Sequence, residues 1–501
     1  MPVPGKATGR DNGAARGAMS NFIDPGQYAP GCGDDNGAMN QYTRADKKNP
    51  ASTDSRDAGD NHRARYYWPV KQKLVAALVF AIAWVVFCTW LALPWIEDLS
   101  ALTGLTGAII IVAGIALIPG FANAFVVSGL IMDRRPRFEP PAELPAVSVL
   151  IPAYNEEARI GETLRAIYRQ DYSGPIELVV VDDGSLDNTT AVAREAAADP
   201  ERPENIKVRV IPQQYNKGKS EALNRALRGA SHDLVITVDA DTWPYRHAFR
   251  NLVTNHICSP KNTRATAGTV LVRNSRKNTL TRLQEWDYFQ GISVVKRIQS
   301  LYQGTMVAQG AFSIYDRGAL EEIGGWQDTV GEDIVLTWAL NSHGYRVGYA
   351  ENAFVFTNVP ETMGGYFRQR RRWARGLMEA FRHHPRVLVR PRLNLPFVWL
   401  NVLYPYLDLM YLLVFIPGII AAVFFQFYAV VGVMTLFLIP LAAVSTSVMY
   451  VKQSRVFRDN GLHIRRNVAG LIGYLAAYQL VLSPASLAGY FSEFFSLRKR
   501  W

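Results

Sequence analysis

Two blocks of apolar sequence, near the two ends of the chain, constrain the fold more than any other feature. Residues 74–95 and 105–132 are each long enough to supply the roughly 20 apolar residues that a helix needs to cross a bilayer. A second block, residues 397–451, suits two helices with a turn near Gln426, and a last apolar segment covers residues 468–491. Sequence of mixed polarity separates the blocks, so we predict a membrane protein that carries a soluble domain.

Charges beside the apolar segments predict how the chain is oriented. Only acidic charges, Glu97 and Asp98, lie between the first two segments, and basic residues flank the pair at Arg63, Arg65, Lys71, Lys73, Arg134 and Arg135. The positive-inside rule therefore places the N-terminus and the middle domain in the cytoplasm. Five spans would put the C-terminus outside, although residues 498–500 are basic. We expect five spans; the alternatives are a re-entrant last segment or a different division of residues 397–451.

Composition narrows the class further. The net charge of +11 fits a membrane surface and phosphate-bearing substrates better than nucleic acid, because much of the Lys and Arg flanks apolar segments. The three cysteines lack metal-ligand or disulfide-framework spacing. We predict a disordered tail at residues 1–66 with no signal peptide, two transmembrane helices within 67–135, a domain at 143–390 and about three transmembrane helices within 397–495.

The middle domain alternates strands and helices. Strand-like runs at 147–151, 177–181, 208–211 and 234–238 are separated by helix-compatible stretches. This pattern predicts a mostly parallel sheet covered on both faces, with ligands beyond the carboxyl ends of its strands. Polar motifs follow three of these strands, at 152–156 (PAYNE), 182–185 (DDGS) and 239–241 (DAD).

The acid pairs at the strand ends indicate a cation site. Asp239 and Asp241 are two residues apart, so their side chains point to the same side of an extended chain. Alone, this pair could be a solvated strand end, and Asp182-Asp183-Gly184 could be only a turn. Because both pairs follow strands of one sheet, they can converge on a hard divalent cation that also takes substrate phosphate oxygens. Neither a P-loop nor a Gly-x-Gly-x-x-Gly turn occurs at these strand ends, so ATP hydrolysis and dinucleotide redox chemistry are disfavoured.

Two later motifs also carry chemistry. Glu332 and Asp333 begin a helix-like run, either as a favourable acidic first turn or as a general base for a sugar hydroxyl. The sequence at 369–373 (QRRRW) could bind anionic lipid headgroups. Alternatively, Arg372 could hold a diphosphate while Trp373 stacks on a sugar ring. The surrounding residues 360–390 are typical of an interfacial amphipathic helix.

These motifs, in this order, resemble the membrane-embedded processive family 2 glycosyltransferases, which include the bacterial synthases of cellulose, hyaluronan, chitooligosaccharides and poly-N-acetylglucosamine. The resemblance covers residues 70–495 and rests on six motifs: 151–156 (IPAYNE), 181–185 (VDDGS), 217–224 (KGKSEALN), 239–241 (DAD), 331–333 (GED) and 369–373 (QRRRW). The layout of spans, the run at 372–376 (RWARG) and the lack of an appended cyclic-di-GMP-binding β-barrel favour the poly-N-acetylglucosamine synthases over the cellulose synthases. Gly331 departs from the Thr common in the family, which is expected to alter backbone freedom more than chemistry.

The resemblance implies an α/β fold of the GT-A (Rossmann-like) type, cytoplasmic and inserted between transmembrane helices of the bacterial inner (plasma) membrane. It implies Asp333 as the catalytic base and Asp239 and Asp241 as ligands of Mg or Mn. It also implies acceptor contacts from Trp373, Phe312 and Glu332. The nucleotide-sugar would be bound by Tyr154, Glu156, Asp182, Asp183, Lys219, Asp239, Gln369 and Arg372.

The expected activity is inverting transfer of a hexosyl unit from a UDP-sugar to a growing β-linked polysaccharide, coupled to export, with N-acetylglucosamine as the favoured unit. Its partners would be the donor, the polymer, the lipid bilayer and, as an option, a small accessory membrane subunit, but not nucleic acid. One alternative is a non-processive enzyme acting on a lipid-phosphate or lipid-linked acceptor. Another is a transporter or sensor whose nucleotide fold has lost catalysis.

Overall fold

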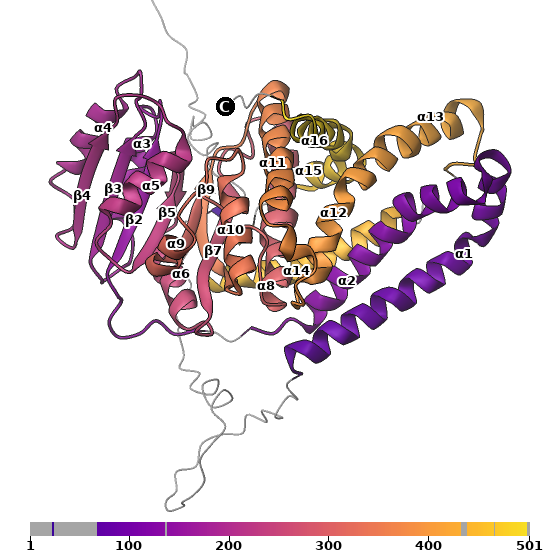
Figure 1. Ribbon diagram of the computed structural model, residues 1–501, viewed down its shortest axis with the longest axis horizontal. Helices are drawn as coiled ribbons and strands as arrows, with labels where there is room; N and C mark the ends of the chain where they lie inside the picture. Colours follow the sequence, from indigo (N-terminus) through magenta and orange to yellow (C-terminus); the bar gives the residue numbers. More distant parts are fainter. Residues whose placement is uncertain (1–22, 25–67, 136–137, 432–437, 465, 498–501) are drawn as a thin grey trace, which may run out of the picture.

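The computed structural model describes residues 23–24, 68–135, 138–431, 438–464 and 466–497. The tail expected to be disordered therefore lies outside the described residues except for Ile23–Asp24 (β1), which pairs with His463–Ile464 (β10). Figure 1 shows a sheet domain at one side and long helices at the other, with α10 and α11 between them.

The sheet has eight strands in the order β4-β3-β2-β5-β8-β7-β9-β6. Strands β4, β3, β2 and β5 are parallel, β8 is antiparallel to β5 and β7, β7 is parallel to β9, and β6 is antiparallel to β9. The strands are β2 (Val147–Ala153), β3 (Ile176–Asp182), β4 (Ile206–Pro212), β5 (Leu234–Val238), β6 (Thr242–Pro244), β7 (Thr263–Val272), β8 (Phe312–Asp316) and β9 (Arg346–Thr357).

Helices cover both faces of this sheet. Along β3, Leu178 and Val180 face one core while Val179 and Val181 face the other, as the two-residue period of a strand requires. The predicted α/β fold class is thus confirmed. The helices of this domain are α3 (Ile160–Tyr168), α4 (Thr189–Ala197), α5 (Lys219–Gly229), α6 (Ala248–Ile257), α7 (Thr279–Asp287), η3 (Tyr288–Val294), α8 (Val295–Leu301), α9 (Arg317–Glu322), α10 (Glu332–His343), α11 (Met363–His383) and η4 (Pro385–Leu388).

Within the described residues, three helical stretches are long and apolar enough to cross a membrane: Val70–Met132, Leu395–Phe425 and Val468–Phe494. The first is folded back on itself (Figure 1), because Gly104 takes φ 72° and ψ 162° and breaks the helix. The second ends at Phe425, where Gln426 adopts a left-handed conformation. The elements are α1 (Val70–Val112), η2 (Ala113–Leu117), α2 (Ile118–Met132), α12 (Leu395–Met410), η5 (Tyr411–Phe415), α13 (Ile416–Phe425), α14 (Leu438–Asp459), α15 (Val468–Gly473), η7 (Tyr474–Tyr478) and α16 (Gln479–Phe494).

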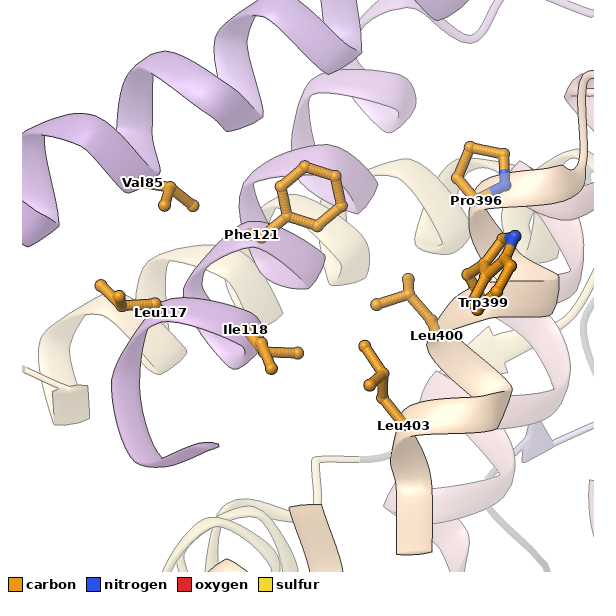
Figure 2. A pocket seen from close by; sticks show the side chains of 8 residues that line it. All are labelled: Val85, Leu117, Ile118, Phe121, Pro396, Trp399, Leu400 and Leu403. Atoms are coloured by element: carbon orange, nitrogen blue, oxygen red, sulfur yellow. The ribbon is translucent and has the colours of Figure 1, made fainter. Parts of the chain in front are cut away.

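An apolar crevice of about 350 Å³ opens between α1, α2 and α12. Figure 2 shows side chains of the three helices around it, among them Val85, Phe121 and Leu403. Surfaces of this kind suit contact with lipid, because no water is available in a bilayer to solvate polar groups.

Ion pairs fix the sheet domain to the end of α2. Arg297 of α8 contacts Asp133 through Nε at 2.5 Å and Glu351 of β9 through Nη1 at 2.6 Å. Arg135 donates to the carbonyl of Tyr349 at 3.0 Å. Since Asp133 has no exposed side-chain surface, these cations compensate a charge that would otherwise be costly to bury.

Candidate functional site

The loops after β2 and β3 are tied to each other. Asn155, at φ 54°, accepts a hydrogen bond from the Leu186 backbone N–H at 2.8 Å and donates its own N–H to Ser185 Oγ at 2.9 Å. Asp182 accepts from the backbone N–H and the hydroxyl of Ser185 and from the Thr190 hydroxyl. Asp182 therefore shapes the loop. Both of its carboxylate oxygens already accept hydrogen bonds, which does not favour the direct contact with a nucleotide that the sequence led us to expect.

Asp183 holds the segment that leads into α5. It accepts backbone N–H groups from Lys217 at 2.9 Å and Gly218 at 2.8 Å. Burial raises the pKa of this carboxyl, against the lowering effect of those two donors. Gly184 makes the approach possible: its φ is +71°, and a Cβ there would lie 2.6 Å from the carbonyl carbon of Tyr215.

Lys219 links motifs from distant parts of the chain. It is the first residue of α5, and its Nζ lies 2.7 Å from Asp239 Oδ1 and 3.2 Å from Glu332 Oε1. The pKa of the ammonium is raised, because its attraction to these acids outweighs the effect of burial. A fixed positive charge at the N-terminus of a helix is thus available to an anionic ligand.

Asp241 lies in the same electrostatic environment without a comparable cation. Burial, followed by repulsion from Asp239 and Glu156, raises the pKa of its carboxyl to about 6. A divalent cation would relieve this repulsion, so Asp241 fits the metal role better than Asp239, whose Oδ1 already contacts Lys219. No group of three or more His, Cys, Asp or Glu among the described residues forms a complete metal site. Such a cation would therefore need oxygens from the ligand.

The Glu332-Asp333 pair opens α10 beside Lys219. Asp333 Oδ1 accepts the Ile334 N–H at 2.8 Å, and Oδ2 accepts the Gly310 N–H at 3.3 Å. Burial raises the pKa of Glu332, partly offset by Lys219. The segment just before the pair is held by Glu379 of α11, which accepts the N–H groups of Val330 at 2.7 Å and Gly331 at 3.1 Å.

Gly331 serves helix packing. A Cβ at this position would lie 2.5 Å from the Cα of Gly376 in α11, and a Cβ at Gly376 would meet Gly331 at 2.7 Å. The φ of Gly331 is −111°, which any residue can adopt. The departure from Thr therefore permits a close backbone contact with α11, a packing role that the sequence did not indicate.

The helix α11 brings the QRRRW segment to this cluster. Trp373 is 39% exposed, and its indole ring is 6.0 Å from the ring of Tyr288. The guanidinium of Arg370 lies 4.1 Å from the centroid of Trp373 and pairs with Asp287 of α7 at 2.8 Å. Arg372 is exposed and lowers the pKa of Glu332, which places its charge near the Lys219 cluster.

The remaining sequence-predicted residues differ in their surroundings, and Glu156 lies near enough to Asp241 for its charge to raise the pKa of that carboxyl. Tyr154 is 43% exposed, Glu156 pairs with Arg159 at 3.0 Å, and the buried Gln369 Oε1 has no hydrogen-bond partner among the described groups. Phe312 is wholly buried and stacks on Phe249 at 5.9 Å. The Phe312 ring belongs to the sheet core and has no exposed surface, so this structure gives no support to the expected acceptor contact.

Sequence reasoning missed three residues. Arg370 supports Trp373, Glu379 holds the segment before Asp333, and Lys296 is buried where it donates to Gln309, next to Gly310. Burial lowers the pKa of Lys296 to about 7, although Asp333 acts in the opposite direction. The available signal for Lys296 and Glu379 was a charged residue on a helix face that is buried. Such residues are seldom buried without a partner, so a contact could have been expected.

The family model described as "Glycosyltransferase like family 2" matches residues 145–376. The poly-beta-1,6-N-acetyl-D-glucosamine synthase of Staphylococcus aureus (strain COL) is 33% identical, and that of Staphylococcus epidermidis is 31% identical, each over 235 residues. The match covers 47% of this chain and 55% of either relative, so the chain spans about half the length of the curated relatives that it matches.

A solved structure shares the fold. The mannosyltransferase PcManGT from Pyrobaculum calidifontis, in complex with GDP-Man and Mn2+, matches with a TM-score of 0.53 and 21% sequence identity. The match covers 78% of this chain and 98% of that chain. At this level of identity the likeness establishes the fold alone, and it confirms the GT-A type.

Proposed function

We propose, from the premise that residues 145–376 form a family 2 glycosyltransferase domain, that this protein transfers hexosyl units from a UDP-sugar to a growing β-linked polysaccharide at the membrane. One observation carries the proposal. Lys219 Nζ contacts Asp239 at 2.7 Å and Glu332 at 3.2 Å, and Asp333 is the next residue after Glu332. The names of the relatives favour N-acetylglucosamine as the unit.

The donor diphosphate would lie between Lys219 and Asp241. Lys219 supplies positive charge at the N-terminus of α5, where backbone N–H groups also favour an anion. Asp241 would hold Mg2+ or Mn2+, which when bound neutralises charge on the departing diphosphate. Arg372, near Glu332, adds a guanidinium that can pair with phosphate oxygens.

Asp333 is the candidate base. It would accept the proton of the acceptor hydroxyl as the acceptor oxygen bonds to the anomeric carbon and the bond to UDP breaks, which inverts the configuration. The N–H groups of Gly310 and Ile334 keep this carboxylate oriented. A base that is fixed before the reaction avoids the cost of ordering it during the reaction.

Trp373 would bind the acceptor. Its partly exposed indole offers one surface to a sugar ring, while Arg370 lies against the ring. Because α11 packs against the apolar C-terminal helix, a lengthening polymer would leave the site directly toward the membrane. We infer a cytoplasmic site in the bacterial plasma membrane and export of the product between the spans.

Labelled UDP-sugars test this proposal. Membranes containing the protein are given each labelled UDP-hexose with Mn2+ or Mg2+, and the product is sized and digested with linkage-specific glycosidases. We expect a long β-linked polymer from UDP-N-acetylglucosamine, its loss in Asp241→Asn, and its retention in Asp199→Asn, a matched change at a surface ion pair with Arg165. A single labelled sugar on lipid would favour the non-processive alternative, and no incorporation from any UDP-hexose would refute the proposal.

A further inference from the structure

The last apolar helix begins against the sheet domain. Asn467, directly before α15, donates to the carbonyl of Arg282 at 3.0 Å, and its own carbonyl accepts from Trp286 Nε1 at 2.9 Å. Arg282 and Trp286 belong to α7, which follows a strand of the sheet. The start of the segment is therefore on the side of the catalytic domain.

The same helix also ends against the sheet domain. Glu493, in the last turn of α16, pairs with Arg375 Nε at 3.0 Å and Arg382 Nη1 at 3.3 Å. Arg375 also donates to the carbonyl of Leu497 at 2.7 Å. The side chains of Arg375 and Glu493 are only 9% and 10% exposed, so this is an enclosed contact and not a loose surface pair.

Between these ends, α16 runs beside α11. Tyr478 packs edge-on against Tyr366 at 5.6 Å, and Gly489 lies so close to the backbone of Arg371 that a Cβ would collide with it. The pairing order, from Tyr366 with Tyr478 to Arg382 with Glu493, shows that the two helices run in the same direction. Figure 1 likewise places α11 next to α16.

Helix α11 itself is fastened to the sheet domain at both ends. Just before its start, the Pro360 carbonyl accepts from Gln284 Nε2 of α7 at 2.8 Å. Near its end, Phe381 packs edge-on against Trp338 of α10 at 4.7 Å. A helix that follows α11 along its length therefore stays beside the catalytic domain, and α16 also meets α12, where Gln479 and Ser483 donate to Asp408 at 3.1 and 2.6 Å.

The opposite end of the spans is marked by another contact. Trp95 Nε1 donates to the carbonyl of Ala429 at 2.9 Å, which joins the acidic turn of α1 to the turn after α13.

We propose that residues 468–494 lie in the plane of the membrane, on the side of the catalytic domain, and do not cross it. The face of this segment that points away from the domain carries exposed apolar side chains: Ile472 is 63% exposed, Phe491 48% and Phe494 80%. In the proposed arrangement lipid covers this face. The polar residues Asn467 and Glu493 bind the domain instead. Such an amphipathic arrangement is typical of helices at a bilayer interface. The length and hydropathy that suggested a fifth span would then serve interfacial anchoring.

This placement removes the conflict in the charge pattern. With both ends of the segment on the side of the catalytic domain, the basic sequence that follows the segment agrees with the positive-inside rule. The inference does not depend on which sugar is transferred, or on whether any sugar is transferred.

Single-cysteine labelling tests it in the full-length protein. Three single-cysteine proteins are compared. Two carry Leu497→Cys or Tyr428→Cys, with Cys32, Cys88 and Cys258 all changed to Ser. The third keeps the native Cys258, which is exposed in the sheet domain, with only Cys32 and Cys88 changed to Ser. Each is reacted with a membrane-impermeant maleimide in right-side-out and in inverted vesicles. We expect Leu497→Cys to react in the same vesicles as Cys258 and in the opposite vesicles from Tyr428→Cys. Reaction of Leu497→Cys together with Tyr428→Cys would overturn the proposal.

A depth measurement distinguishes an in-plane helix from a re-entrant one. Spin labels at Ile472, Leu480 and Phe491, which are all at least 41% exposed, are compared by relaxation with oxygen and with a water-soluble paramagnet. An in-plane helix predicts similar, shallow depths at the three sites. A markedly deeper Leu480 would contradict the in-plane arrangement even if both ends of the segment share one side.

Discussion

Arg370→Met should separate the folding role of Arg370 from its role in orienting Trp373. Arg370 is 4% exposed, its Nη2 lies 2.8 Å from Asp287, and its guanidinium lies 4.1 Å from the Trp373 ring and 5.1 Å from the Tyr366 ring. Removing one partner of a buried ion pair costs about 3 kcal/mol, the lower end of the usual range, because the Asp287 side chain is 16% exposed. The contact with Trp373 affects a different quantity. If the indole binds the acceptor, losing the contact should raise the activation free energy by about 1 kcal/mol, which is roughly a fivefold loss of kcat/KM.

The two effects are measured on one set of purified variants. Thermal unfolding in detergent reports stability, and initial rates with a short acceptor oligosaccharide report KM and kcat. Asp287→Asn combined with Arg370→Met leaves no unpaired carboxylate, so it should recover stability without recovering the acceptor KM. Arg370→Lys should retain part of both, and Arg368→Met, an exposed arginine on the same helix, serves as the matched control.

Two results would refute this reasoning. An acceptor KM in Arg370→Met equal to that of the wild type would show that the guanidinium does not orient Trp373. Equal losses in Arg368→Met would show that the effect follows from the charge of the helix and not from the buried contact.

Two further predictions concern stability. Gly331→Ala should lower the free energy of unfolding by about 1–3 kcal/mol, because its Cβ would meet Gly376. Gly318→Ala, with open space around its Cβ, is the control and should not destabilise the protein. Chemical denaturation of both variants checks this, and equal stabilities would contradict it. Lys296 has a folded-state pKa lowered to about 7 from 10.5, so between these values the unfolded chain binds more protons and stability should rise with pH by at most about 1.4 kcal/mol per unit. The gain in stability is lost as the pH falls toward 7, and Lys296→Met should not show it. The melting temperature of the wild type should therefore rise more between pH 7 and pH 9 than that of Lys296→Met. Equal changes in the two proteins would refute the lowered pKa.

The first half of the sheet was predictable because its signals are local. The apolar runs expected at 177–181 and 234–238 correspond to β3 (Ile176–Asp182) and β5 (Leu234–Val238), and the acid pairs follow those strands. The antiparallel part was not predictable, because β8 is placed by pairings such as Val238 with Phe312, which are remote in sequence. The burial of Phe312 was hidden for the same reason: its register, not its motif, decides that it faces the core.

The site was predictable as a set of motifs but not as a geometry. The spacing of Asp239 and Asp241 is visible in the sequence, yet only the fold shows that Lys219 contacts the first and leaves the second without a cation of its own. The support from Glu379 and Arg370 depends on how α11 packs on α7 and α10. No periodicity in the sequence contains that information.

Asp333→Asn tests the central claim most directly. The claim is that one site binds a UDP-sugar near Lys219 and Asp241 and uses Asp333 only to accept a proton. In purified protein with Mn2+, the account predicts that the variant binds the UDP-sugar with a Kd within about threefold of the wild type while its transfer rate falls at least about 100-fold. Transfer at the wild-type rate, or a loss of donor binding as large as the loss of transfer, would contradict it.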